Sequence, residues 1–152
     1  MDNKDIVKTL NSLIETSKDG EYGFRLSSEH AQSDLIKSLF LARAGECAQA
    51  ASELQTLVLQ YGGKAETTGS ATGSLHRGWV AVKGTLAGYS DLNMLEEAER
   101  GEDVALEQYR NALRQVDLPG EVRSLVERQF QGVKYNHDQI RGLREQARAS
   151  SH

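Results

Sequence analysis

DLNMLEEAERGEDVALEQYRNALRQV, residues 91–116, is the stretch of sequence that decides the fold. Its apolar residues recur every three or four positions, which is the spacing of one face of an α-helix. Two carboxylates, Glu99 and Glu102, fall on that same face, where an ionised group is costly unless it is paired or bound to a metal. The stretch therefore predicts a helix that carries a polar layer into an apolar core. The positions on this face are Leu92, Leu95, Glu99, Glu102, Leu106, Tyr109, Leu113 and Val116.

Three other stretches repeat this period and predict three further long helices. Ser33 is a suitable N-cap for the second helix, and the glycines at 62 and 63 are typical of its end. Ser90 or Asp91 can cap the helix quoted above, and Pro119 suits the first turn of the last one. The three stretches cover about residues 5–28, 34–61 and 119–146.

The connection between the second and third long helices is long enough to cross the bundle. Residues 64–73 are rich in Gly, Ser and Thr and predict a surface connection, and residues 75–86 predict a short helix that carries Trp79. His76 in this segment has two interpretations, a surface site with Glu53 or packing of the crossover. The predicted fold is all-α: a four-helix bundle with a long crossover that holds a short extra helix.

Glu21 on the first helix and His137 on the last also fall on apolar faces. Residues equally far from the turn of a helical hairpin lie at the same height, so Glu99 is expected beside His137. If residues 62–90 span the bundle, Glu21 reaches this height as well. The sequence thus predicts one buried layer that contains Glu21, Glu99, Glu102 and His137.

Composition excludes several classes of protein. The 152 residues suit a single domain over 1–152, and one proline among many Ala, Leu, Glu, Gln and Arg residues favours helix. A net charge of −4 offers no broad cationic surface, so neither nucleic acid nor an anionic membrane is an expected partner. Cys47 is the single cysteine, which excludes an internal disulfide, and it is expected in the core. The charged N-terminal stretch lacks the apolar run of a signal peptide, so we expect a cytoplasmic protein.

Five glycines lie inside the predicted helices near the height of the polar layer, and each costs about 1 kcal/mol relative to alanine. Two interpretations stay open, because such glycines either permit close approach of helix backbones or open the bundle around a site. They are Gly20, Gly23, Gly45, Gly101 and Gly132.

Several phrases, in this order, resemble the bacterial ferritin-like four-helix-bundle proteins of unknown function. They are LNSLIET (10–16), KDGEYGF (18–24), ELQ (53–55), LHRGW (75–79), ERGED (99–103), ERQ (127–129) and HD (137–138). The resemblance extends over nearly the whole chain. It implies a ferritin-like fold, and it implies no activity, because none is assigned to that group.

Ferritin-like di-iron proteins use Glu-x-x-His motifs on two of their helices. No such motif occurs here, because Ser27, Gly73 and Lys134 precede His30, His76 and His137 by three positions. A standard di-iron centre is therefore not expected. A reduced site remains compatible with the sequence, holding one or two ions of iron or manganese, with zinc less favoured, in a bacterial metal or stress-related role. Its ligands would be Glu21, Glu99, Glu102 and His137.

An alternative needs no metal. Arg43 lies on the apolar face of the second helix at nearly the height of the carboxylates, and Arg25 and Lys134 are further candidates. A guanidinium can satisfy two carboxylates through its fork of donors. The protein would then be a non-enzymatic structural or interaction protein. Apolar residues at expected outer positions favour a homodimer in either case; they are Leu39, Leu41 and Val58.

Overall fold

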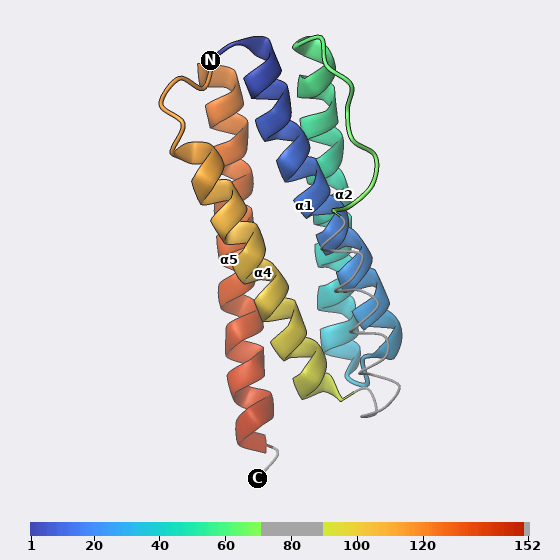
Figure 1. The fold of residues 1–152 in the computed structure, drawn as a ribbon. Helices are drawn as coiled ribbons and strands as arrows, with labels where there is room; N and C mark the ends of the chain where they lie inside the picture. The colour runs from blue at the N-terminus through green and yellow to red at the C-terminus, as the bar shows by residue number, and fades with distance from the viewer. Residues whose placement is uncertain (71–89, 151–152) are drawn as a thin grey trace.

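The computed structural model describes residues 1–70 and 90–150, and four long helices dominate it (Figure 1). The described residues contain no strand, so the predicted all-α bundle is confirmed. The extra helix predicted over 75–86, with His76 and Trp79, lies outside the described residues. The four helices are α1 (Asn3–His30), α2 (Asp34–Gln60), α4 (Asp91–Leu113) and α5 (Gly120–Ser150).

Side-chain caps fix where three of the helices begin. Asp2 caps α1, and the hydroxyls of Ser33 and Ser90 accept hydrogen bonds from the third backbone N–H that follows each of them, at 3.3 and 3.1 Å. Both predicted serine caps are thereby confirmed. Just after α2, Gly62 has φ 76°, a left-handed conformation that glycine adopts without steric cost.

The helices form two antiparallel hairpins, α1 with α2 and α4 with α5 (Figure 1). Packing is extensive within each hairpin, whereas between the hairpins it is mostly between α1 and α4. Val58, expected at an outer position, is instead fully buried, while Leu41 is exposed. Val58 packs inward because it continues the buried spacing of Leu54 on α2.

Two apolar clusters form the core, one towards each end of the bundle. The first, which includes Leu10, Leu54 and Val122, joins all four helices near the turn between α4 and α5. The second, which includes Phe40 and Leu95, lies towards the turn between α1 and α2. Polar side chains are also buried, among them Ser17, Ser27, Ser28, Arg43, Glu97, Glu102, Gln129 and Asn136. Of the four residues that the sequence analysis placed in one buried layer, Glu102 is among these buried side chains, whereas Glu21, Glu99 and His137 are partly exposed.

None of the helices within residues 1–70 and 90–150 combines the length and the apolar character that crossing a membrane requires.

Candidate functional site

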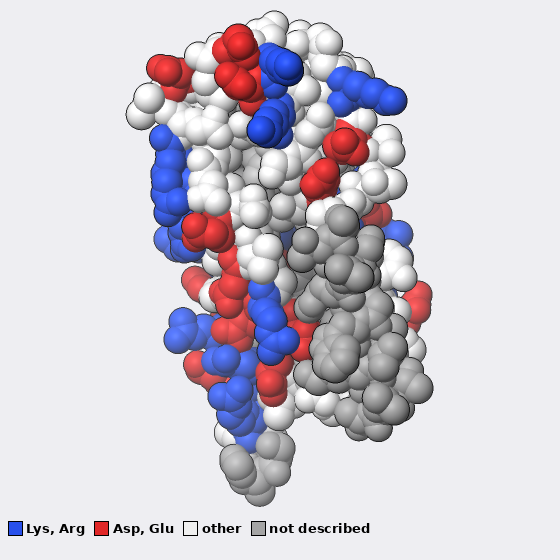
Figure 2. All heavy atoms as spheres, viewed as in Figure 1, with Lys and Arg blue, Asp and Glu red and all other residues white. Residues whose placement is uncertain are grey.

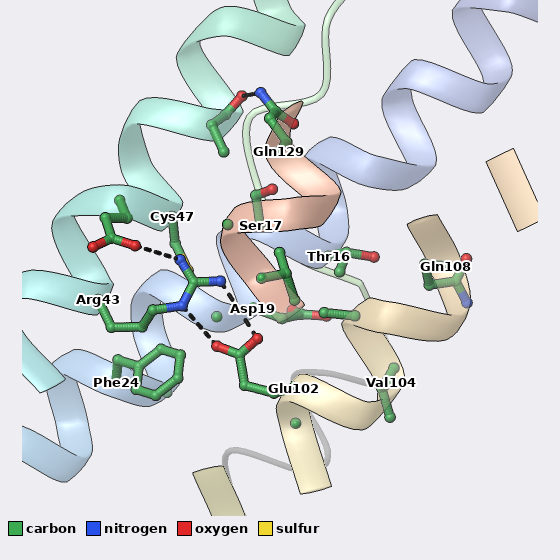
Figure 3. Close-up of a pocket in the computed structure, with 18 of the residues that line it drawn as sticks. Thr16, Ser17, Asp19, Phe24, Arg43, Cys47, Glu102, Val104, Gln108 and Gln129 are labelled. Atoms are coloured by element: carbon green, nitrogen blue, oxygen red, sulfur yellow. Dashed lines mark hydrogen bonds and ion pairs between the residues drawn. The ribbon is translucent and has the colours of Figure 1, made fainter. Parts of the chain in front are cut away.

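Arg43 and Glu102 form a buried ion pair between α2 and α4. Figure 3 shows the Arg43 side chain extending from α2 towards Glu102 on α4. Arg43 Nε donates to Glu102 Oε1 at 2.7 Å and Nη2 donates to Oε2 at 3.4 Å, which is the two-pronged geometry that arginine makes with a carboxylate. The two side chains are only 7% and 2% exposed. Glu102 thus has an internal cation, as the arginine alternative predicted.

Two further groups hold the guanidinium of Arg43. Its Nη1 donates to Glu46 Oε2 at 3.3 Å, and its carbon atom Cζ lies 5.7 Å from the centre of the Phe24 ring. Asn136 on α5 donates to the same Glu46 oxygen at 2.8 Å. Residues of all four helices therefore meet around Arg43.

Burial shapes the ionisation of this pair. Burial raises the pKa of Glu102, and the charge and hydrogen bonds of Arg43 oppose that rise. For Arg43, burial alone would lower the pKa, but the charge and hydrogen bonds of Glu102 and the charge of Glu46 raise it overall. The guanidinium consequently remains a fixed positive charge in the layer.

The other three residues of the predicted layer have different partners. Glu21 pairs with Lys18 at 3.4 Å and Arg25 at 3.2 Å, both on its own helix. Glu99 pairs with Arg144 at 3.0 Å. Their partners are thus basic side chains, of which the sequence analysis named only Arg25.

The ring of His137 is held between two aspartates. Its Nε2 forms a 2.7 Å hydrogen bond with Asp103 Oδ1, and its Nδ1 lies 3.3 Å from Asp138 Oδ1. The sequence analysis expected it beside Glu99, which lies about one helical turn from Asp103. Side chains lean towards the N-terminus of their own helix, so α4 side chains lean away from the α4–α5 turn and α5 side chains lean towards it. An α5 residue therefore meets an α4 residue that lies nearer to the turn than equal counting predicts. This lean accounts for the difference in register.

Within residues 1–70 and 90–150, no three His, Cys, Asp or Glu side chains form a group that could hold a metal ion. The metal site proposed from Glu21, Glu99, Glu102 and His137 stays a prediction.

A pocket of about 870 Å³ lies between the two hairpins, with all four helices contributing to its wall. We call it the central pocket. Arg43 and Glu102 lie in its wall, together with Phe24 on α1 and Gln129 on α5 (Figure 3). It exists because small side chains occupy the facing positions, including Ala42, Ala50, Ala98 and Ala105.

The helix glycines contribute to the same pocket, and the structure resolves the two interpretations left open by the sequence. All five line it. A Cβ atom added at Gly23, Gly45, Gly101 or Gly132 would meet no atom of the described residues within 4 Å, so these four open space. Gly20 differs, because a Cβ there would lie 2.8 Å from Cys47 Sγ. Close approach is therefore the role of Gly20 alone among the five.

Polar bonds replace apolar packing where α5 faces α2. Gln129 donates to the Ala50 carbonyl and to Glu53, both at 3.2 Å, and accepts from the Tyr109 hydroxyl at 2.8 Å. Arg128 donates to Glu53 at 2.7 Å. These bonds connect the hairpins across the wall of the central pocket.

The sequence analysis identified neither Gln129 nor Asn136 as a buried residue of the last helix. It placed His137 on the buried face, whereas the structure buries Asn136, one position earlier. A strict alternation of steps of three and four would have identified them, since the buried positions of α5 are Val122, Val126, Gln129, Val133, Asn136 and Ile140.

Two buried groups beside the pocket are kept protonated by their surroundings. Burial raises the pKa of the Cys47 thiol to about 12, although Arg43 opposes the rise. Burial also raises the pKa of Tyr109 to about 12. Cys47 is thus a core residue, as expected, and its thiol is not an activated nucleophile.

Comparison with known proteins supports the fold. A family model described as a domain of unknown function (DUF2383) matches residues 5–115. The structure is similar to that of the bacterioferritin-related protein from Bacteroides fragilis, described as a dodecameric thioferritin, with a TM-score of 0.78 over 99% of this chain and 91% of that one. The two sequences are 10% identical, so the likeness shows the fold alone. The predicted ferritin-like bundle is confirmed. No curated protein matches the chain.

Proposed function

The chain belongs to this DUF2383 family, and we propose that it is a binding protein whose central pocket holds a small organic molecule. The observation that carries the proposal is the pocket itself. Its volume of about 870 Å³ is within the range of roughly 300–1,000 Å³ typical of small-molecule sites. Apolar residues such as Phe24, Val104 and Val133 would contact the body of a ligand, while a few polar groups would orient it.

The Arg43–Glu102 pair would form a fixed polar part of this wall. Because the pair is internally satisfied, the layer needs no metal ion to neutralise Glu102. This arrangement supports the non-enzymatic alternative of the sequence analysis, in which arginine pairs with the buried carboxylates. We place such a protein in the cytoplasm, with a homodimer as its simplest assembly.

A cavity-filling variant tests the binding proposal. Gly132 lines the pocket and has open space at its Cβ position. The side chain of Gly132→Trp would point towards the preceding turn of α5, which carries Arg128 and Gln129, and its indole would fill part of the pocket. Gly142→Trp is the matched control, because Gly142 also has open space and lies on α5 outside the pocket. NMR screening of a fragment library against the wild type should yield hits that Gly132→Trp abolishes and Gly142→Trp retains. A screen without hits, or hits indifferent to both variants, would contradict the proposal.

A metal site is the second candidate, favoured by the fold likeness to a protein described as a thioferritin. Iron or manganese would be held by Glu21, Glu99, Glu102 and His137, in a bacterial metal or stress-related role. These side chains would have to leave their present partners, among them Arg43 and Arg144. Iron(II) titration of the wild type and of Glu102→Ala, which would lack one ligand, distinguishes this candidate from the first. The metal site predicts iron binding by the wild type that the variant loses.

A further inference from the structure

The central pocket is longer than it is wide. Its lining extends over residues 12–27 of α1, 42–53 of α2 and 97–109 of α4, but only over residues 128–133 of α5. At 1.5 Å per residue these stretches are about 22, 16 and 18 Å long, against about 8 Å on α5. A volume of about 870 Å³ spread over about 18 Å corresponds to a width of about 8 Å. The pocket is therefore elongated parallel to α1, α2 and α4.

The register of α1 against α4 explains this shape. Gln115 Nε2 donates to Thr9 Oγ1 at 3.0 Å. Ser12 Oγ donates to Gln108 Oε1 at 3.5 Å, so the two helices are antiparallel and in contact at this end. Counted onward from these bonds, the next facing residues of both helices are small and line the pocket: Thr16 with Ala105, Gly20 with Gly101, and Gly23 with Ala98. Side chains of this size do not reach across, so a space remains between the helices along this stretch.

Apolar side chains of three helices line this space. Phe24 belongs to α1, Val104 to α4 and Val133 to α5. The charged pair of Arg43 and Glu102 lies part-way along the wall but is almost fully buried, so it presents little surface to a ligand. Burial of hydrocarbon against such a wall is favourable roughly in proportion to the apolar area removed from water. The pocket therefore suits a hydrocarbon chain.

The length of the pocket is sufficient for an extended chain. With C–C bonds of about 1.5 Å at tetrahedral angles, each carbon lengthens an extended chain by about 1.3 Å, so ten carbons span roughly 12 Å. Such a chain fits within the length of about 18 Å along α4. Phe24 and Gln108 lie at opposite sides of the pocket (Figure 3), so the two ends of an extended chain would contact different residues.

We infer that the ligand of the central pocket is a molecule with a long unbranched apolar chain, which lies extended between α1 and α4 and parallel to their axes. This inference rests on the proposed function, because it names the class of molecule that the pocket binds.

Three uncharged probes of increasing length test the inference: hexan-1-ol, octan-1-ol and decan-1-ol. NMR titration of the full chain should show binding that tightens by about fourfold for each added CH₂ group. In the decan-1-ol complex, nuclear Overhauser effects should connect the two ends of the chain to opposite ends of the pocket, one to Phe24 and the other to Gln108.

A variant that divides the pocket separates its length from its volume. Gly101 lies part-way along the α4 wall, and a Cβ atom there would meet no atom of the described residues within 4 Å. Gly101→Phe should weaken decan-1-ol binding at least about tenfold, because part of the chain loses its burial. The same variant should change hexan-1-ol binding less than about twofold, because a chain of roughly 8 Å still fits in the undivided part. Gly142→Phe, on α5 outside the pocket, is the control and should affect neither alcohol.

The outcomes separate the two proposals. If Gly101→Phe weakens all three alcohols alike or leaves decan-1-ol binding unchanged, the inference of an extended chain is wrong. It is also wrong if both ends of decan-1-ol contact the same end of the pocket. In each of these cases the binding proposal stands as long as Gly132→Trp blocks the alcohols. If none of the three alcohols shifts resonances of pocket residues in the wild type, both proposals are contradicted.

Discussion

Arg43→Met removes the only cation within hydrogen-bond reach of Glu102 in the described structure, and it is the substitution that most directly perturbs the polar layer. Glu102 would remain 2% exposed with a charge that nothing neutralises. Loss of one partner of a buried pair costs about 3–5 kcal/mol, a large part of a typical free energy of unfolding of about 5–15 kcal/mol. The contact with Phe24 would also be lost.

The same pair predicts a strongly non-additive double variant. Arg43→Met combined with Glu102→Leu removes both charges and fills their space with apolar atoms. Such replacements are often neutral or stabilising, so the double variant should lie within about 1 kcal/mol of the wild type or above it. A coupling energy of several kcal/mol would follow, because each single change leaves one buried charge behind.

Urea denaturation followed by circular dichroism at 222 nm measures these differences. With an m-value of about 2 kcal/mol/M, Arg43→Met should lower the urea midpoint by about 2 M. Arg114→Met is the control, because Arg114 and its partner Glu107 are 66% and 54% exposed; such a pair contributes about 1 kcal/mol at most. If Arg43→Met costs no more than this control, the reasoning about the buried layer is refuted.

Lowering the pH should reduce the difference in free energy of unfolding between the wild type and Arg43→Met. Burial already raises the pKa of Glu102, and loss of Arg43 would raise it further. A folded-state pKa above the unfolded one gives a stability contribution that is present at low pH and is lost as pH rises through the folded-state pKa. The gap between wild type and Arg43→Met should therefore shrink from pH 7 towards pH 4, and a gap that widens would contradict the assignment.

The remaining predictions concern the wall of the pocket. Gly101→Ala should raise the free energy of unfolding by about 0.5–1 kcal/mol, because its Cβ meets open space. Gly20→Ala should instead lower it through the 2.8 Å approach to Cys47 Sγ, and Cys47→Ala should rescue it; thermal melts of the three variants check both signs. Cys47 and Tyr109 have folded-state pKa values of about 12 against ordinary values of 9.0 and 10.0, so their contribution to stability is fully present below about pH 9 and is lost as pH rises towards 12. The melting temperature should fall between about pH 9 and pH 12, and it should fall less steeply in Cys47→Ala. Equal slopes in the two proteins would contradict a contribution from ionisation of Cys47. Gln129→Ala leaves the Tyr109 hydroxyl without the acceptor Gln129 Oε1, so urea denaturation should show a free energy of unfolding about 1–3 kcal/mol lower. An unchanged free energy of unfolding would contradict a stabilising role of Gln129.

The fold was largely predictable because local rules determine most of it. The spacing of apolar residues located all four long helices, and the serine caps at Ser33 and Ser90 set where two of them begin. Glu102 could be placed in the core from the same spacing, and Arg43 as its possible partner from its height on the second helix. These features depend on one helix or on the simple geometry of a hairpin.

The rest depends on relations between helices that spacing alone does not define. Because the predicted phase of the last helix was wrong by one position, the sequence analysis expected His137 on the buried face, where the structure has Asn136. Because side chains lean along their helices, Glu99 pairs with Arg144 and not with His137, which equal counting had placed beside it. Surface charge gave no guide either, since Figure 2 shows acidic and basic side chains interleaved over the lower part of α4 and α5.

The pocket could not be predicted from sequence at all. Glycine in a helix is compatible with close packing and with open space, and Gly20 and Gly101 show one case each. Which of the two applies depends on how far the hairpins separate. That separation follows from the packing of whole helices, including the polar bonds made by Gln129.

Elemental analysis of protein purified without a metal-binding tag, before and after incubation with iron(II) or manganese(II), tests most directly the claim that arginine neutralises the buried carboxylates. The account predicts much less than one metal ion per chain in the wild type, and no difference between wild type and Glu102→Ala. Near-stoichiometric metal in the wild type that is lost in Glu102→Ala would contradict it, and would establish Glu102 as a ligand in place of a partner of Arg43.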